Sequence, residues 1–169
     1  MREQLTKILV SLVVSDQYLD REEEELFWHA VNRTQMDPQE AESLLLEILE
    51  QHQAERESTI YQELKVYLSG PLRDGLLDFE EEENSHQWLL QCDHIPFGVH
   101  KRLIYEACRE LGAHVASELI DELIDTFRQR YQMPLWSEQE RRDAEQWAIT
   151  RWSGITGKQV WELLDSYLD

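Results

Sequence analysis

Two stretches of the chain carry nearly the same eight-residue pattern. The first runs from Asp16 to Glu23 and the second from Asp74 to Glu81, which places the copies 58 residues apart. Both can be written D-[GQ]-x-L-D-x-E-E. A pattern that recurs at this distance predicts an internally repeated protein, and we expect each copy to form the corner between two helices.

Apolar residues are spaced three and four positions apart along most of the chain, as on the buried face of an amphipathic helix. The first such face comprises Leu5, Ile8, Leu9, Leu12 and Val13. Only 6 glycines and 4 prolines occur in the 169 residues, too few for an architecture of many strands and turns. The pattern predicts a compact all-α fold of about eight or nine helices, with the polar stretch 51–57 as a weak point or turn.

The acidic residues of the two corners have the spacing of helix caps. The side chain of Asp20 is placed to accept a hydrogen bond from the backbone amide of Glu23, while Glu23 reaches back to Asp20. Asp78 and Glu81 stand in the same relation in the second copy. This interpretation makes the corners helix-start signals.

A third, weaker copy of the helix pair follows. Ser137 and Glu140 form another capping box, and Leu163 aligns with Leu103, but Met133-Pro134 stands where the acidic corner would be. No linker separates the copies. We therefore expect a single domain over residues 1–169, with a repeated core over 5–130 and an added or diverged helix pair over 133–169.

The composition is strongly acidic. The chain has 35 aspartates and glutamates against 16 lysines and arginines, a formal net charge of −19. Such a charge repels nucleic acid phosphates and anionic membranes, so we expect no direct binding to either. The expected partner is a protein with a basic or apolar surface. An acidic mimic of DNA is a further alternative that fits the charge.

The compartment is indicated by the chain's start and its cysteines. Residues 1–4 lack the basic start of a signal peptide, and the apolar run 8–14 is too short to span a bilayer. Two cysteines, Cys92 and Cys108, are too few for a disulfide framework. We expect a cytoplasmic protein.

The duplicated corner resembles that of the TerB-like family of tellurite-resistance and related helical domains. Their hallmark is a helix, a D-G-x-hydrophobic-D-x-E-E corner and another helix, in two pseudo-symmetric copies. The resemblance covers residues 5–130, with Gln17 in place of the first glycine. It implies a TerB-like fold and an accessory role in stress-response or defence systems. It also implies that the corner acids could bind metal: Asp16, Asp20, Glu23, Asp74, Asp78 and Glu81.

A divalent-metal-binding or sensing domain at these corners is therefore an alternative to the capping interpretation. A second metal hypothesis is a zinc site among the histidines and cysteines of residues 86–114, but their spacing does not match that of zinc fingers. Cys108 lies on an apolar helical stripe and is more simply a core residue. We expect no cofactor beyond such an ion.

Catalytic motifs are missing from the sequence: it has no G-x-S-x-G, no phosphate-binding glycine loop and no H-E-x-x-H. We therefore expect a non-catalytic interaction module, an adaptor or accessory factor, rather than an enzyme. Trp152, at an expected helix end, is predicted to be partly exposed and to anchor a partner. Glu22 and Glu25 are the acidic residues expected to contact the same or another basic partner.

Overall fold

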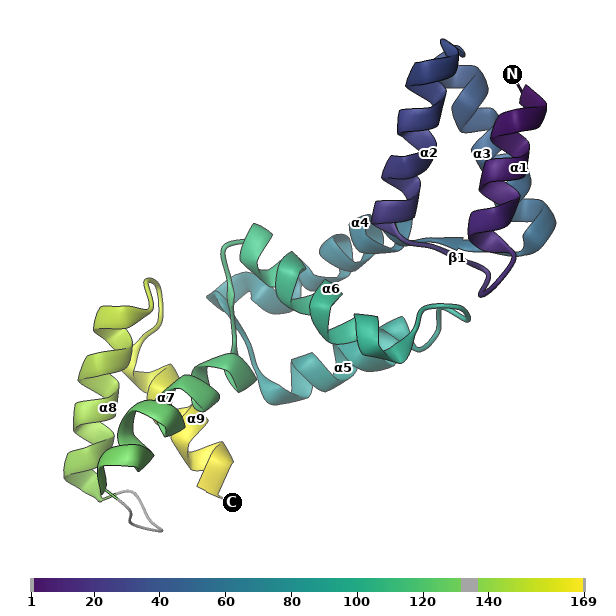
Figure 1. Cartoon of the computed structure of the whole chain (residues 1–169). Coiled ribbons are helices and arrows are strands. Elements are labelled where there is room, and N and C mark those ends of the chain that lie inside the picture. The colour runs from purple at the N-terminus through teal and green to yellow at the C-terminus, as the bar shows by residue number, and fades with distance from the viewer. Residues whose placement is uncertain (1, 132–136, 169) are drawn as a thin grey trace. The chain divides into compact units, whose positions relative to one another are not determined.

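The computed structural model describes residues 2–131 and 137–168, and this part of the chain is mostly helical. Figure 1 shows the elements. The described helices are α1 (Arg2–Val13), α2 (Arg21–Thr34), α3 (Pro38–His52), α4 (Glu57–Leu68), α5 (Phe79–Leu89), α6 (Phe97–Glu110), α7 (Ala116–Tyr131), α8 (Glu138–Arg151) and α9 (Gly157–Leu168), with a short 3-10 helix η1 (Pro71–Asp74) before the second corner. These nine α-helices of the described residues agree with the number expected from apolar spacing.

Within residues 2–131 and 137–168, four two-residue strands accompany the helices and were not expected. They are β1 (Tyr18–Leu19), β2 (Glu55–Arg56), β3 (Leu76–Leu77) and β4 (His114–Val115). β1 pairs with β2 and β3 with β4, both in parallel. The stretch expected to be a weak point or turn thus contains the end of α3, the strand β2 and the start of α4. Strands of only two residues have no alternation that periodicity could detect.

The helices fall into three successive triplets. In the first two, α1 to α3 and α4 to α6, a corner strand lies between the first helix and the second. The third triplet, α7 to α9, begins after β4. Its α8 starts with the expected capping box, in which the Ser137 side chain accepts from the Glu140 amide at 3.2 Å. Met133-Pro134, predicted to replace the third corner, lies outside the described residues.

Two compact units can be distinguished in the chain. One comprises residues 1–64 and 87–103, and the other residues 65–86 and 104–169. The expectation of a single domain stays a prediction, since a compact unit is not by itself an independently folding domain. No helix of the described residues is long and apolar enough to cross a membrane.

The core of the first unit lies between α1, α2 and α3. Leu5, Leu9 and Val13 of α1 are fully buried against Phe27 of α2 and Leu45 of α3. Three of the five residues predicted for this face are thus buried, and the other two, Ile8 and Leu12, are half-buried against the same core. Each buried leucine stabilises the fold by roughly 1.5 to 3 kcal/mol, so this face is sufficient to hold α1 in place.

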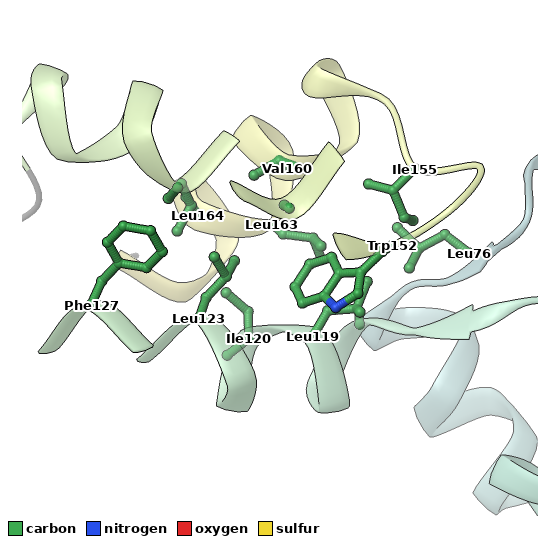
Figure 2. Packing of buried hydrophobic residues seen from close by; sticks show 13 residues of the cluster. Leu76, Leu119, Ile120, Leu123, Phe127, Trp152, Ile155, Val160, Leu163 and Leu164 are labelled. Carbon is green, nitrogen blue, oxygen red and sulfur yellow. The ribbon is translucent and has the colours of Figure 1, made fainter. Parts of the chain in front are cut away.

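The core of the second unit gathers around α7, α8 and α9. Figure 2 shows Leu119 and Leu123 of α7, Leu163 of α9 and the Trp152 indole within one cluster. Trp152 is only 4% exposed, so the prediction that it is partly exposed is wrong. The reason is tertiary: its ring packs against Trp147, and its indole nitrogen donates to a carboxylate oxygen of Glu122 at 2.7 Å.

Candidate functional site

The leading aspartate of each corner hydrogen-bonds to the backbone of its own corner. Asp16 accepts from the amide of Tyr18 at 3.3 Å, and Asp74 accepts from the amide of Leu76 at 3.1 Å. This local bond is the usual way in which aspartate stabilises a turn. In both copies it directs the chain into the first residue of a strand, β1 or β3.

The residue after each leading aspartate has a left-handed backbone. Gly75 has φ of 82° and Gln17 has φ of 58°. Such a conformation costs a non-glycine residue about 1 to 2 kcal/mol. The Gln17 side chain offsets part of this cost by donating to the carbonyl of His52 at 3.1 Å. The first corner therefore keeps the turn of the second despite its missing glycine.

Both corners end in the expected capping boxes. The amides of Glu23 and Glu81 each donate to the preceding aspartate, Asp20 or Asp78, at 2.8 Å. The two glutamates accept from the aspartates' amides at 3.2 and 3.1 Å. Burial raises the pKa of Glu23 and of Glu81, and the neighbouring carboxylates add to the rise. The four side chains thus cap the N-termini of α2 and α5, as the capping interpretation predicted.

Metal binding finds no support in this geometry. Within residues 2–131 and 137–168, no three His, Cys, Asp or Glu side chains are grouped so that they could hold an ion. Burial raises the pKa of Cys108 to about 12, and its thiol lies in the core as the apolar stripe predicted. Binding of an ion by the six corner acids stays a prediction.

Behind the first corner lies a charged cluster that the sequence did not reveal. Glu57, the first residue of α4, is completely buried. Its carboxylate accepts from the Tyr18 hydroxyl at 2.5 Å, from Arg21 at 2.7 Å and from Arg102 at 2.8 Å. Burial alone would raise its pKa, but these three donors outweigh it and hold the pKa of Glu57 below its usual value. This carboxylate is therefore ionised at neutral pH.

The two corners can be aligned in sequence through their strands and serines. Strand β2 and strand β4 lead directly into α4 and α7, whose second residues are Ser58 and Ser117. Ser58 donates to Glu24 at 2.6 Å, and Ser117 donates to Glu82 at 3.0 Å, with both glutamates four residues after the corner's second aspartate. This repeated contact makes Glu57 and Ala116 equivalent positions.

The second corner replaces every member of the charged cluster. Leu76 of β3 occupies the position of Tyr18, and Phe79, at the start of α5, occupies the position of Arg21. On the last helix of the triplet, the alignment of Leu103 with Leu163 places Glu162 where α6 has its arginine. The equivalent pairs are Tyr18 and Leu76, Arg21 and Phe79, Glu57 and Ala116, and Arg102 and Glu162.

In place of the cluster, the second corner has an open pocket, which we call the second-corner pocket. It has a volume of about 500 Å³ and lies between residues 74–80 and α9. Four exposed carboxylates line it, those of Asp74, Asp78, Glu80 and Glu162. Among the described residues, no lysine, arginine or histidine belongs to its lining. The pocket therefore attracts positive charge.

The floor of the second-corner pocket is apolar. Leu76 and Leu163 are buried at 5% and 4% exposure, and Phe79, which also lines the pocket, is half-buried. Figure 2 shows the two leucines as part of the core of this unit. One lysine reaches the rim from outside: Lys158 donates to Glu162 at 2.9 Å from one helical turn earlier, with its side chain 83% exposed. Such an exposed pair is readily exchanged for another cation.

Of the residues predicted to contact a partner, Glu22 and Glu25 are indeed exposed. They lie on the outer face of α2 beside Leu26, which is 59% exposed. The corner acids Asp74 and Asp78 line the second-corner pocket, whereas Asp16 and Asp20 do not belong to its lining. Sequence reasoning missed Glu162, although the exchange of Arg102 for a glutamate was visible beside the aligned leucines.

Fold and site together define an acidic, mostly helical protein with a pocket beside the second of its two acidic corners. In comparisons of the chain with family models, with curated proteins and with solved structures, nothing matched. Its function must therefore be inferred from the geometry of its own residues.

Proposed function

We propose that this protein is a non-catalytic, TerB-like interaction module that binds a basic protein partner in the second-corner pocket. The observation that carries the proposal is the composition of the pocket: four carboxylates at its rim and an apolar floor, with no basic side chain of the described residues in its lining. A protein surface that presents a basic side chain with an apolar stem fits both parts.

Charge supports the same choice of partner. The formal net charge of −19 speeds the approach of a basic protein and slows that of nucleic acid or another acidic protein. The repeated corner, with its two capping boxes and matching strand pairs, supports the TerB-like assignment and the accessory role that the family implies. Two unpaired cysteines support a cytoplasmic location for this role.

The experiment is site-specific photo-cross-linking in the cells that produce the protein. A photoreactive phenylalanine replaces Glu80 at the pocket, Glu25 on α2 or Asp125 on α7, all three exposed. We expect capture of one basic protein from position 80 and much less from positions 25 and 125. The captured protein is then purified and its affinity for the unmodified chain measured by calorimetry at two salt concentrations.

Charge reversal separates the pocket from the other acidic surface. The double variant Glu80→Lys with Glu162→Lys should weaken binding of the purified partner by about 100-fold, since two rim contacts change from attraction to repulsion. The matched double variant Glu22→Lys with Glu25→Lys has the same net charge and should keep the affinity within about threefold. Equal losses in the two variants, or capture chiefly through position 25, would exclude the pocket as the binding site.

A further inference from the structure

The first corner shows what kind of group this architecture accommodates. Two guanidinium groups form ion pairs with Glu57. Arg21 comes before it in the chain, at the start of α2, and Arg102 comes after it, on α6. Arg21 also lies over the ring of Tyr61, 4.6 Å from its centroid. The corner of this repeat is thus filled from within by arginine, held between a carboxylate and an aromatic face.

At the second corner the same two positions carry Phe79 and Glu162, and among the described residues no arginine belongs to the lining of the pocket. The lining instead contains the complementary groups, the aromatic side chain of Phe79 and four carboxylates, around an open volume of about 500 Å³. We infer that the second-corner pocket receives an arginine side chain from the partner protein. The inference depends on the proposed function and specifies the chemistry of its partner.

Arginine fits the pocket better than lysine for two physical reasons. The planar guanidinium can donate to two or more carboxylates at once, whereas an ammonium acts as a compact point charge. The lining offers carboxylates from the corner (Asp78, Glu80) and from α9 (Glu162). A guanidinium also stacks on aromatic rings, and the half-buried ring of Phe79 belongs to the pocket lining. Its three-carbon stem would lie against Leu76 and Leu163 on the floor.

The test is an NMR titration of the isotopically labelled full chain with a tri-arginine peptide and, separately, with a tri-lysine peptide. We expect saturable shifts of backbone amides in residues 74–80 and 159–166, and about threefold or greater preference for tri-arginine. In Glu162→Arg, which restores the residue type of the first corner, the chain fills its own pocket and the affinity should fall at least about tenfold.

The matched control is Asp125→Arg, an equal change of charge at an exposed position of α7 outside the pocket. It should keep the affinity within about twofold. Glu80→Gln provides a milder second variant, with an expected loss of about threefold. The spectrum of each variant reports directly whether it is folded.

Equal binding of the two peptides, shifts spread evenly over the acidic surface, or equal losses in Glu162→Arg and Asp125→Arg would overturn the inference. None of these outcomes affects the proposed function if cross-linking at position 80 still captures a basic protein. Conversely, selective tri-arginine binding with no captured protein in cells would leave the pocket chemistry standing and reject the proposed function.

Discussion

Replacing Glu57 by glutamine removes the charge at the centre of the first corner. The carboxylate accepts from three donor groups, and the free energy that each contact contributes depends on how exposed the donor is. The bond from the buried Tyr18 hydroxyl is worth about 1.5 kcal/mol, because it joins a neutral donor to a buried charge. Arg21 and Arg102 are 33% and 43% exposed, so solvent screening reduces each ion pair to about 0.5 to 1 kcal/mol. The expected loss of unfolding free energy is therefore about 3 kcal/mol at pH 7.

Urea unfolding, followed together by circular dichroism and tryptophan fluorescence, measures this loss. With a slope of about 2 kcal/mol per molar urea, the midpoint should fall by about 1.5 M. Glu25→Gln, an exposed substitution in the same unit, is the control and should change the free energy of unfolding by less than about 0.5 kcal/mol. A midpoint for Glu57→Gln within about 0.3 M of the wild type would refute the assignment of Glu57 as the organising charge.

The same variant makes a prediction about pH. The pKa of Glu57 lies below its usual value of 4.5 in the folded chain, so its contribution to stability is fully present above about pH 4.5 and lost as the pH falls through the folded pKa. The difference in stability between the wild type and Glu57→Gln should therefore shrink on acidification below pH 4.5. A difference that stays constant from pH 7 down to about pH 2.5 would mean that the lost energy does not come from ionisation.

Three further outcomes are expected. Gly75→Ala should lower stability by about 1 kcal/mol in thermal unfolding, because φ is 82° and no atom lies within 4 Å of the added carbon, so only backbone strain contributes; an unchanged melting temperature would contradict the strain. Trp152→Ala should lower the free energy of unfolding by about 3 to 5 kcal/mol in urea, because a buried ring is removed from the core. Trp152→Phe should lower it by only about 1 kcal/mol, chiefly through loss of the hydrogen bond to Glu122. Similar losses in the two variants would contradict a core role. With Ellman's reagent, the half-buried thiol of Cys92 should react in the folded chain and the buried thiol of Cys108 only after unfolding; a fast reaction that survives Cys92→Ser would reverse this order.

Local signals in the sequence were sufficient for the helices and their starts. The capping boxes at Asp20, Asp78 and Ser137 involve partners three residues away, so residue type and spacing specify them without knowledge of the fold. The apolar face of α1 was likewise predictable, since a buried stripe at helical spacing has few alternatives. The repeat located both corners, and one of them lines the candidate pocket.

Contacts distant in the sequence could not be predicted in this way. Glu57 lies in a polar stretch, and its arginine partners are 36 and 45 residues away, so no local pattern distinguishes it from a solvated glutamate. Trp152 has the sequence context of an exposed helix end, but Glu122 and Trp147 draw it into the core. Strands β2 and β4 become strands only because another segment lies beside them.

The sequence by itself determined the helices, their caps and the two acidic corners, because each depends on interactions within a few residues along the chain. Only the tertiary structure decided that one corner holds a buried ion cluster and the other an open acidic pocket. At one of them α6 brings Arg102 to a buried carboxylate, and at the other α9 brings Glu162 to the rim of an open pocket. The physical reason is that the charge balance of a corner depends on which side chain a distant helix places beside it, and local spacing carries no information about that.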